Sequence, residues 1–547
     1  MAILEIFKKR CLNADRVTEE RLLSLLKENA DTEYGKLYDF KAINSVSDYK
    51  RRVPFTEFKD YEDAVRRMTH GEKNILTAYP IAFYAHTSGT LGAAKFIPVS
   101  EKAEEIQHMY RPFPSEVYAE FLGGKPMNKP DHPKVLYLIT ARGSSAPDGT
   151  LITNFSGRLA FEQKEAVMNT AVKPELIFCT EQMDIMYLFA FYALKERELF
   201  HIGAPFMSAI SDFFCYIRNH WEKLCRDIGE GILRPDVRTS DSVLERLNVD
   251  LTPDPQRAEE LYNIFSKGFD KPIASDIWPY LCSVRGIGAA SFSSYTKIVQ
   301  SFIGDIPIYM SMYAASEGVF GVAIKMNAPE YVMIPQAGYF EFIPEKDMQL
   351  PETELMERTL GMNELQIGER YEMVVTNLSG FYRYRIGDVV TVNGYFGRSP
   401  VICFAYRRHQ ILNVVGEKTH EDMMIYAING MKEQTGINVV EWSVCADQST
   451  SPARYMIFME TDPEVDTGKK QEMRDILEEK LSKASEYYHH YIQENKLGPM
   501  ELVLLQAQTY ALYRDIQVWN GASPNQLKPV HIINDPKTKA FFCGLKR

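Results

Sequence analysis

Three hydroxyls, two glycines and a lysine lie between two strand-like runs near residue 90. The run Ile81 to Ala85 precedes the segment Thr87-Ser88-Gly89-Thr90-Leu91-Gly92-Ala93-Ala94-Lys95, and the run Phe96 to Val99 follows it. Glycines let backbone N–H groups turn toward an anion, and Thr and Ser hydroxyls donate to phosphate oxygens. The segment therefore predicts a loop between two strands that wraps a polyphosphate. The alternative is an ordinary Gly/Ser turn of a hairpin.

Other nucleotide and hydrolase signatures are missing from the sequence. The P-loop string G-x-x-x-x-G-K-[ST], which must open a helix, occurs nowhere, and Lys95 instead enters a short run that ends at Pro98. Gly286 to Ser291 lacks the third glycine of a dinucleotide-binding turn, and no G-x-S-x-G is present. The sequence thus favours nucleotide chemistry of another kind.

Length and composition indicate a folded protein with about two to four structural units. The chain has 547 residues, is 45% hydrophobic and carries a formal charge of −11, which disfavours a nucleic-acid partner. No signal peptide is evident, and no apolar stretch approaches the ~20 residues that span a bilayer. The eight cysteines are dispersed without a C-x-x-C pair, as in proteins with reduced thiols. We expect a cytoplasmic monomer that binds neither membrane nor nucleic acid.

Alternating strand-like and helix-like segments predict an α/β fold with several sheets. A helical lead-in is expected over residues 1–74, within a large domain over residues 1–406, and a smaller α+β domain over residues 407–547. In the larger domain, strands are expected at 135–139, 306–312, 371–375, 389–392 and 401–405, with a buried helix at 181–195. In the smaller domain, Thr419 and Asp422 resemble a capping box for a helix to about Lys432. A long helix is expected there from Lys469 to Asn495.

Three further clusters carry groups suited to nucleotide binding. The segment Tyr313-Ala314-Ala315-Ser316-Glu317-Gly318 follows a predicted strand; a tyrosine can stack on a purine, and a carboxylate can hold Mg²⁺. Tyr382-Arg383-Tyr384-Arg385-Ile386-Gly387-Asp388 opens another strand; an aspartate can bind ribose hydroxyls, and the arginines can neutralise it or reach phosphates. Gly521 to Pro529 is a loop with one lysine, Lys528. Each cluster alone fits equally well an ordinary polar loop, a surface ion pair or a solvated lysine.

Taken together, these clusters resemble the motifs of the adenylate-forming enzymes. The order matches the plant auxin-responsive acyl acid amido synthetases and their bacterial relatives, whose motifs look like [ST]-S-G-T-x-G-x-x-K, Y-[AG]-x-S-E, Y-R-x-G-D and G-x-S-x-N-Q-x-K. Here they stand as Thr87 to Lys95, Tyr313 to Glu317, Tyr384 to Asp388 and Gly521 to Lys528. The leader Asn29 to Gly35, Val53-Pro54, and Arg407 to Lys418 extend the resemblance over nearly the whole chain. Ala315 replaces the small polar residue usual in the second motif.

The resemblance implies a two-step reaction with ATP and Mg²⁺. A carboxylate attacks the α-phosphorus of ATP to give an acyl-adenylate and pyrophosphate, and an amine, usually an amino acid, then displaces AMP. It implies that the larger domain binds ATP and the acyl group and that the smaller one is a mobile lid. Composition and position favour Arg407-Arg408-His409, at the domain junction, as the hinge. The implied catalytic groups are Glu317, which would also bind Mg²⁺, and Lys528. The implied nucleotide contacts are Thr87, Ser88, Gly89, Thr90, Gly92, Lys95, Tyr313, Ala314, Ser316, Tyr384, Asp388 and Arg407.

The substrates are less well determined. The helix after the first loop, with Tyr110, Arg111 and Phe113, is where relatives often contact the acid, although Arg111 also fits a solvated surface arginine. Residues 137–142 end a strand that could line the same cleft. Aromatic or indole acids suit a chain rich in Tyr and Phe, yet most such residues belong to the core. A CoA-thioester ligase and a nucleotide- or acyl-binding protein without turnover remain alternatives.

Overall fold

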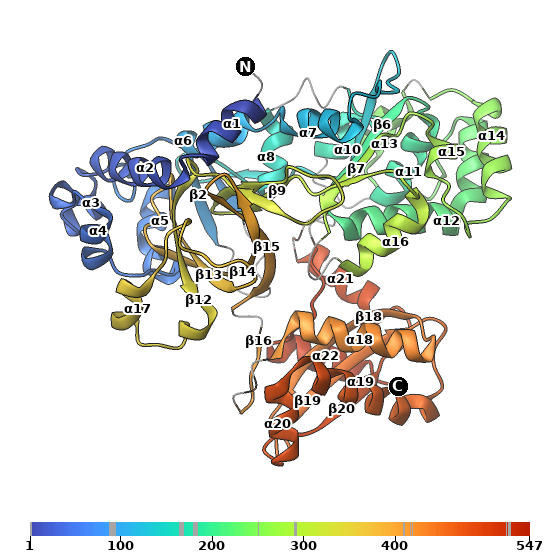
Figure 1. The fold of residues 1–547 in the computed structure, drawn as a ribbon. Coiled ribbons are helices and arrows are strands. Elements are labelled where there is room, and N and C mark those ends of the chain that lie inside the picture. Colours follow the sequence, from blue (N-terminus) through green and yellow to red (C-terminus); the bar gives the residue numbers. More distant parts are fainter. Residues whose placement is uncertain are drawn as a thin grey trace. The chain divides into compact units, whose positions relative to one another are not determined.

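We describe the protein from a computed structural model. It describes residues 3–86, 95–162, 169–178, 184–249, 251–288, 293–408, 411–415, 417, 419–520, 522 and 527–547. Residue contacts divide the chain into two units (Figure 1). The first consists of Met1–Ile386 and Val390–Cys403, and the second of Gly387–Val389 and Phe404–Arg547. Helices and several sheets alternate along the chain, so the expected α/β class with an additional smaller domain is confirmed.

Helices occupy the N-terminal seventy residues, where the apolar pattern predicted them. They are α1 (Ile3–Cys11), α2 (Ala14–Glu28), α3 (Glu33–Leu37), α4 (Val46–Arg52) and α5 (Glu62–Thr69). The side chains of Thr32 and Ser45 accept hydrogen bonds from the first turns of α3 and α4, which fixes where these helices begin.

One residue of the lead-in joins a strand that lies far along the chain. Thr56 forms a parallel bridge with Tyr384, and its hydroxyl donates to the carbonyl of Tyr382, 326 residues away. The hydroxyl of Tyr61 donates to the same carbonyl, 3.1 Å away. The lead-in is therefore part of the core of the first unit.

The two strands that flank the first motif belong to a four-stranded sheet with strand order β2-β1-β5-β4. The strands are β1 (Ile81–His86), β2 (Phe96–Ser100), β4 (Gly143–Ser145) and β5 (Leu151–Thr153). β1 and β2 pair antiparallel, as expected for the two runs that flank the loop. The helices α6 (Glu101–Met109), α7 (Phe113–Leu122) and α8 (Phe155–Glu162) follow these strands. Ser100 caps α6, since its hydroxyl accepts from the N–H of Ala103.

A second four-stranded sheet is parallel, with the order β3-β6-β7-β8. Its strands are β3 (Lys134–Tyr137), β6 (Leu199–Phe206), β7 (Ser283–Ile287) and β8 (Ile308–Tyr309). Its helices are α10 (Pro174–Phe178), α11 (Ile185–Lys195), α12 (Met207–Glu230), α13 (Asp241–Asn248), α14 (Pro255–Phe265), α15 (Ala274–Ile277) and α16 (Ser293–Ile303) (Figure 1). Nine of the eleven residues of α11 are buried, so the expected buried helix is confirmed over its described part.

The third sheet has seven strands in the order β12-β13-β14-β15-β11-β10-β9. They are β9 (Met312–Ala315), β10 (Gly318–Val322), β11 (Tyr331–Met333), β12 (Gly338–Pro344), β13 (Arg370–Asn377), β14 (Tyr384–Phe396) and β15 (Ser399–Arg407), with α17 (Glu352–Arg358) between β12 and β13. The predicted strand over 306–312 was wrong as one element: β8 and β9 belong to different sheets. β14 begins at Tyr384, so the third motif lies inside the strand that it was expected to precede.

The second unit places helices on both faces of a three-stranded sheet, β18-β19-β20. The strands of this sheet are β18 (Val439–Asp447), β19 (Arg454–Thr461) and β20 (Gly498–Leu504). Two further short strands, β16 (Ile411–Leu412) and β17 (Thr419–His420), pair with each other in a separate two-stranded sheet. The helices are α18 (Glu421–Thr435), α19 (Lys470–Ala484), α20 (Glu486–Gln493), α21 (Thr509–Trp519) and α22 (Pro536–Gly544). One core joins the sheet to α18 and α19, and another joins it to α21 and α22.

Two helix predictions in this unit were wrong in detail. The expected helix from Lys469 to Asn495 is two helices, because Ser485 has an extended backbone (φ −134°, ψ 106°) and its hydroxyl caps α20 at Tyr488. The expected capping box fails because Thr419 lies in β17 and α18 is preceded by His420, without a side-chain cap.

The seven cysteines that the structure describes are all free thiols. Among the described residues, none of the helices combines the length and the apolar character needed to cross a bilayer.

Candidate functional site

The first motif is described only at its end. β1 leads into residues 87–94, which include the predicted phosphate contacts Thr87, Ser88, Gly89, Thr90 and Gly92; these lie outside the described residues. Lys95 is exposed immediately before β2, with Nζ 5.2 Å from the centre of the Phe58 ring. This distance is within the range of a cation–π contact. The lysine therefore stands at the base of the predicted loop.

The second motif forms a tight β-hairpin. Ala315 pairs with Gly318, which leaves Ser316 and Glu317 as the two turn residues between β9 and β10, while Ala314 pairs with Val319 in the strands. The turn thus presents Glu317 at the end of the seven-stranded sheet.

The tyrosine of this motif lies inside β9. The Tyr313 side chain is 7% exposed, and its ring packs 6.3 Å from that of Phe320 and 5.9 Å from that of Tyr331. Most of its surface is thus already in contact with the sheet's own aromatic residues.

Two neighbouring strands hold Glu317. Asn377, the last residue of β13, donates from Nδ2 to the backbone carbonyl of Glu317 at 2.9 Å. Tyr384, the first residue of β14, donates from its hydroxyl to Glu317 Oε1 at 3.3 Å. Asn377 Oδ1 in turn accepts from the backbone N–H groups of Ser379 and Phe381, at 2.9 and 3.0 Å. The second and third motifs therefore meet at the Glu317 carboxylate. The sequence analysis missed Asn377, which holds the backbone of Glu317.

The arginines of the third motif do not serve phosphates or Asp388. Arg383 is fully buried with Glu341, to whose carboxylate Nε and Nη2 donate at 3.0 and 2.9 Å. Arg385 pairs with the buried Glu372, 2.9 Å from Nε. Both guanidinium groups are thus committed to structural ion pairs of the first unit, which corrects the expectation from sequence.

Asp388 is neutralised by a different arginine. Its carboxylate is 3% exposed, and Arg407 Nε and Nη2 lie 2.8 and 2.7 Å from Oδ1. The backbone N–H of Arg408 donates to the carbonyl of Gly387 at 2.7 Å. Asp388 and Arg407 both belong to the second unit. The ion pair therefore places the Asp388 carboxylate beside Arg407, close to Phe404, where the longer segment of the second unit begins.

Lys528 is exposed on a loop whose far end is anchored. Ser443 donates from its hydroxyl to the carbonyl of Val530, and the backbone of His531 and Ile533 pairs with Val444 of β18, at 2.7 and 2.9 Å. The remaining residues of the predicted lysine loop, 521 and 523–526, lie outside the described residues.

The anchor is a buried cation between two carboxylates. His531 Nδ1 lies 2.6 Å from Glu421 Oε1, and Nε2 lies 3.0 Å from Glu441 Oε1. Its ring stacks on Trp442 at 4.1 Å. Burial alone would lower the pKa of His531, but the charges and hydrogen bonds of Glu441 and Glu421 raise it to about 9. The imidazolium therefore fixes the segment that carries Lys528, a role that the sequence analysis missed because its partners lie 90 and 110 residues away.

The expected acyl-contacting residues are mostly core. Tyr110 and Phe113 are buried, and each ring packs edge-to-face on that of Phe7, at 5.5 and 5.3 Å. Arg111 pairs with Glu162 rather than lying free in solvent. These residues stabilise the junction of α1 with α7.

A cluster of Glu104, His108 and Glu162 has the composition of a metal site, with ligand atoms within 4.8 Å of one another. Its carboxylates are already paired with guanidinium groups: Arg158 Nε lies 2.6 Å from Glu104, and Arg158 Nη2 lies 3.1 Å from Glu162. A cation would have to displace these, so we assign the cluster to the packing of α6 against α8.

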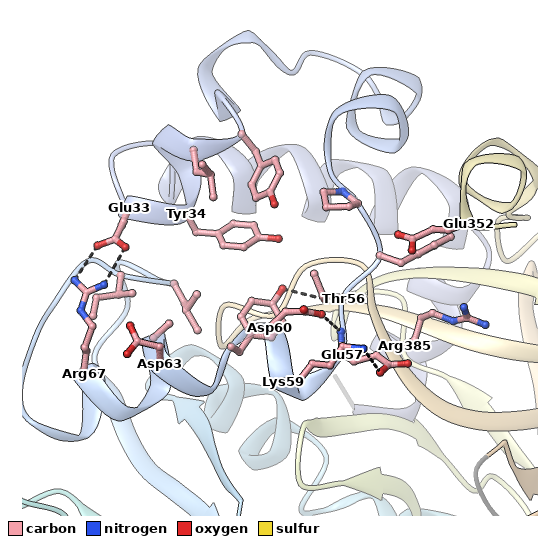
Figure 2. Close-up of a pocket in the computed structure, with 18 residues that line it drawn as sticks. Glu33, Tyr34, Thr56, Glu57, Lys59, Asp60, Asp63, Arg67, Glu352 and Arg385 are labelled. Carbon is pink, nitrogen blue, oxygen red and sulfur yellow. Dashed lines mark hydrogen bonds and ion pairs between the residues drawn. The ribbon is translucent and has the colours of Figure 1, made fainter.

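A cavity of about 550 Å³ lies between α3, α5 and the segment 54–61 (Figure 2). Its charged groups largely satisfy one another. Arg67 donates to both oxygens of Glu33 at 2.9 and 2.8 Å, and Lys59 lies 3.2 Å from Glu57. The carboxylate of Asp60 accepts from the backbone N–H of Glu57 at 2.8 Å. Of the described groups expected to reach the nucleotide, only Arg385 lines this cavity, and it is paired with Glu372, so we assign the cavity no binding role.

Comparison with known proteins covers the chain in three consecutive segments. Residues 3–308 match the GH3 family N-terminal domain, residues 331–407 the GH3 family central domain, and residues 422–537 the GH3 family C-terminal domain. The indole-3-acetic acid-amido synthetase GH3.3 of Arabidopsis thaliana is 27% identical, over 96% of this chain and 90% of that protein. The probable indole-3-acetic acid-amido synthetase GH3.11 of Oryza sativa subsp. japonica is also 27% identical, over 96% and 92%. The solved AtGH3.15 acyl acid amido synthetase in complex with 2,4-DB has the same fold, with a TM-score of 0.83, 22% identity and coverage of 100% and 96%.

Proposed function

The chain belongs to the GH3 family, and from that premise we propose that it is an ATP-dependent acyl acid amido synthetase. It would adenylate a carboxylic acid, with release of pyrophosphate, and then transfer the acyl group to an amine, an amino acid, with release of AMP. The relatives named as indole-3-acetic acid-amido synthetases support both half-reactions. They also make indole-3-acetate the first acid to test.

The observation that carries the proposal is the meeting of two motifs at Glu317. A hairpin turn presents its carboxylate, Asn377 holds its backbone and Tyr384 donates to its side chain. Carboxylate oxygens are the ligands that Mg²⁺ takes beside phosphates, so the group fits this ion. Bound there, Mg²⁺ would draw negative charge from the phosphates of ATP.

The other groups would act on charge and position, on which phosphoryl and nucleotidyl transfer mainly depend. Lys95 and the loop before it would cradle the β- and γ-phosphates. Asp388, oriented by Arg407, would accept hydrogen bonds from the ribose hydroxyls. Lys528 would neutralise charge between the α-phosphate and the attacking carboxylate. We further propose that the second unit serves as the lid, with Arg407 near the hinge.

A first experiment measures carboxylate-dependent ATP–pyrophosphate exchange with indole, aromatic and fatty acids. We expect exchange with one acid class, at least a 100-fold loss in Lys528→Ala, and wild-type rates in Lys537→Ala, an exposed lysine of the same unit. The Lys528→Ala protein should still transfer the acyl group from a supplied acyl-adenylate. ATP binding without exchange for any acid would refute the enzyme and favour a binding protein.

A second assay identifies the acceptor. Once an acid is known, amino acids and CoA are supplied in parallel and the products are separated. Amide products would support the proposal, and thioester products would support the alternative of a CoA ligase with the same adenylation step. We also propose that the chain acts in the cytoplasm as a monomer, to be tested by cell fractionation and by light scattering.

A further inference from the structure

A second cavity, of about 450 Å³, lies between two helix faces of the first unit. From α2 it is lined by Val17, Glu20, Arg21 and Ser24, and from α6 by Lys102, Glu105, Ile106 and Met109. Both sets follow the i, i+3, i+4, i+7 spacing of one helical face. Arg10, Gln336 and Leu378 complete the lining. The volume is in the range of small-molecule sites.

The cavity gathers positive charge that its own carboxylates compensate only in part. Glu20 and Glu105 already have partners, since Arg16 lies 3.7 Å from the first and Lys102 lies 3.2 Å from the second. For Arg10 and Arg21, no carboxylate within ion-pair distance is found in the described part of the chain. Two guanidinium groups therefore line one cavity without a carboxylate in direct contact, although Arg21 lies near enough to Glu28 to act on its charge.

The contacts that these guanidinium groups do make are weak or incomplete. Arg10 Nη1 lies 2.8 Å from the thioether sulfur of Met109, which is a weak acceptor, and the guanidinium also interacts with the Tyr110 hydroxyl. Neither partner carries a charge. Arg21 Nε is buried without an acceptor among the described residues. Glu28, further along α2, accepts hydrogen bonds from Ser24 and Tyr79. Burial would raise the pKa of Glu28, but these bonds and the charges of Lys102 and Arg21 lower it, so Arg21 meets this carboxylate only at a distance. A buried N–H without an acceptor costs about 1–3 kcal/mol, which a bound anion would recover.

A buried amide provides an independent sign of a ligand. The Gln336 side chain is 4% exposed; one end of its amide contacts the Tyr110 hydroxyl, and Oε1 at the other end has no partner among the described residues. Because a hydroxyl can donate or accept, the amide can present either its oxygen or its NH₂ toward the cavity. Buried polar groups of this kind are normally satisfied.

The other walls are apolar. Val17, Ile106, Met109 and Leu378 offer a surface for a compact hydrocarbon or aromatic group. We propose that this cavity, hereafter the α2–α6 site, binds a small organic carboxylate whose charged end meets Arg10 and Arg21 and whose apolar body lies against α6. Guanidinium groups bind carboxylates with two parallel hydrogen bonds, which favours this head group.

The α2–α6 site lies next to the residues that support Glu317 but is not part of the proposed nucleotide site. Ser100, the cap of α6, donates from its hydroxyl to the carbonyl of Leu378 at 2.7 Å. The preceding residue, Asn377, holds the backbone of Glu317. None of the predicted nucleotide-binding residues lines the cavity. A ligand in this cavity would contact Leu378, the residue next to Asn377, which holds the backbone of Glu317.

Hydrogen–deuterium exchange of the full chain tests the proposal locally. The probe is naphthalene-1-acetate, its neutral comparator is naphthalene-1-acetamide, and inorganic phosphate tests the head group alone. We expect the acid to slow exchange in peptides from α2 and α6, the amide to have at least 10-fold lower apparent affinity, and phosphate to protect weakly. Equal protection by the amide would overturn the proposal, because the guanidinium groups would then have no role.

Matched variants separate this site from the reaction site. Arg21→Gln should raise the probe concentration for half-protection at least 10-fold, and Arg16→Gln, an exposed arginine of the same helix, should leave it unchanged. Arg21→Lys keeps the charge and guards against a folding defect, which thermal melting would reveal. Protection confined to peptides around Glu317 would also overturn the proposal. The readout needs no turnover, so failure of the amido synthetase proposal would leave it intact.

Discussion

The Tyr384 hydroxyl donates to Glu317 Oε1 across 3.3 Å, joining two residues that lie 67 positions apart in the chain. The bond connects the turn of one hairpin with the first residue of a strand in the same sheet. Since a carboxylate that binds Mg²⁺ must be oriented, we treat this contact as part of the proposed site.

Tyr384→Phe removes the hydroxyl and keeps the ring, which packs 4.9 Å from that of Phe381. We expect pyrophosphate exchange to fall about 5-fold, the equivalent of a hydrogen bond of about 1 kcal/mol, and the Mg²⁺ concentration for half-maximal rate to rise. The control is Tyr395→Phe, whose hydroxyl donates to two backbone carbonyls of the same unit. An unchanged Mg²⁺ concentration for half-maximal rate would show that Tyr384 does not contribute to the proposed Mg²⁺ site.

Asp388→Asn tests the ribose contact. The amide keeps the shape of the carboxylate but loses the charge that pairs with Arg407, so we expect the KM for ATP to rise about 10-fold. Asp447→Asn is a matched control, because Asp447 is also buried and lies 3.3 Å from Arg454 in the same unit. A similar KM shift in both variants would indicate a general effect of losing a buried ion pair.

Arg383→Met tests the structural role of the arginine that directly precedes the third motif. It leaves Glu341 charged and buried without its partner, so we expect the free energy of unfolding to fall by about 3–5 kcal/mol. Arg51→Met, at an exposed arginine of α4, should change it by less than about 0.5 kcal/mol. Urea denaturation measures both. Full stability in Arg383→Met would show that the pair is dispensable, and the double variant Arg383→Met/Glu341→Leu should recover most of the loss.

His531 makes the stability of the second unit depend on pH. Its pKa is raised to about 9 in the folded chain, so its contribution is fully present below the unfolded value near 6.5 and is lost as the pH rises through 9. The shift corresponds to roughly 3 kcal/mol. We expect the difference in unfolding free energy between wild type and His531→Asn to shrink from pH 6 to pH 10. A difference that does not vary with pH would mean that the histidine is not charged when folded.

Local patterns predicted the strands well where apolar residues formed an uninterrupted run. β1, β2 and β13 appear within two residues of their expected bounds because β-branched and aromatic residues dominate them. The apolar pattern did not predict the helix boundary at Ser485, because a polar side chain that caps a helix determines it. Ser485 ends α19 and caps α20, yet the charged sequence around it is compatible with one continuous helix.

The candidate site was only partly accessible from sequence. The order of the motifs identified Glu317 and Tyr384, but not that they touch, because their contact depends on the neighbouring positions of β9–β10 and β14 in three dimensions. Arg383 and Arg385 carry the same charge as Arg407 and lie closer in sequence to Asp388, yet the structure pairs Asp388 with Arg407. Sequence spacing cannot distinguish these partners, since alternate residues of a strand point to opposite faces.

The hydrogen bond from Thr56 to the carbonyl of Tyr382 also has a consequence for folding during synthesis, because its two residues are made at different times. The partner of Thr56 is 326 residues downstream, so the N-terminal helices leave the ribosome long before the strand that completes their packing exists. At translation rates of 5–20 residues per second, that delay is roughly 16–65 s. During this interval the apolar surface of the N-terminal helices is not covered by its later partners. The nascent chain, rather than the finished protein, is therefore the form most exposed to chaperones and proteases.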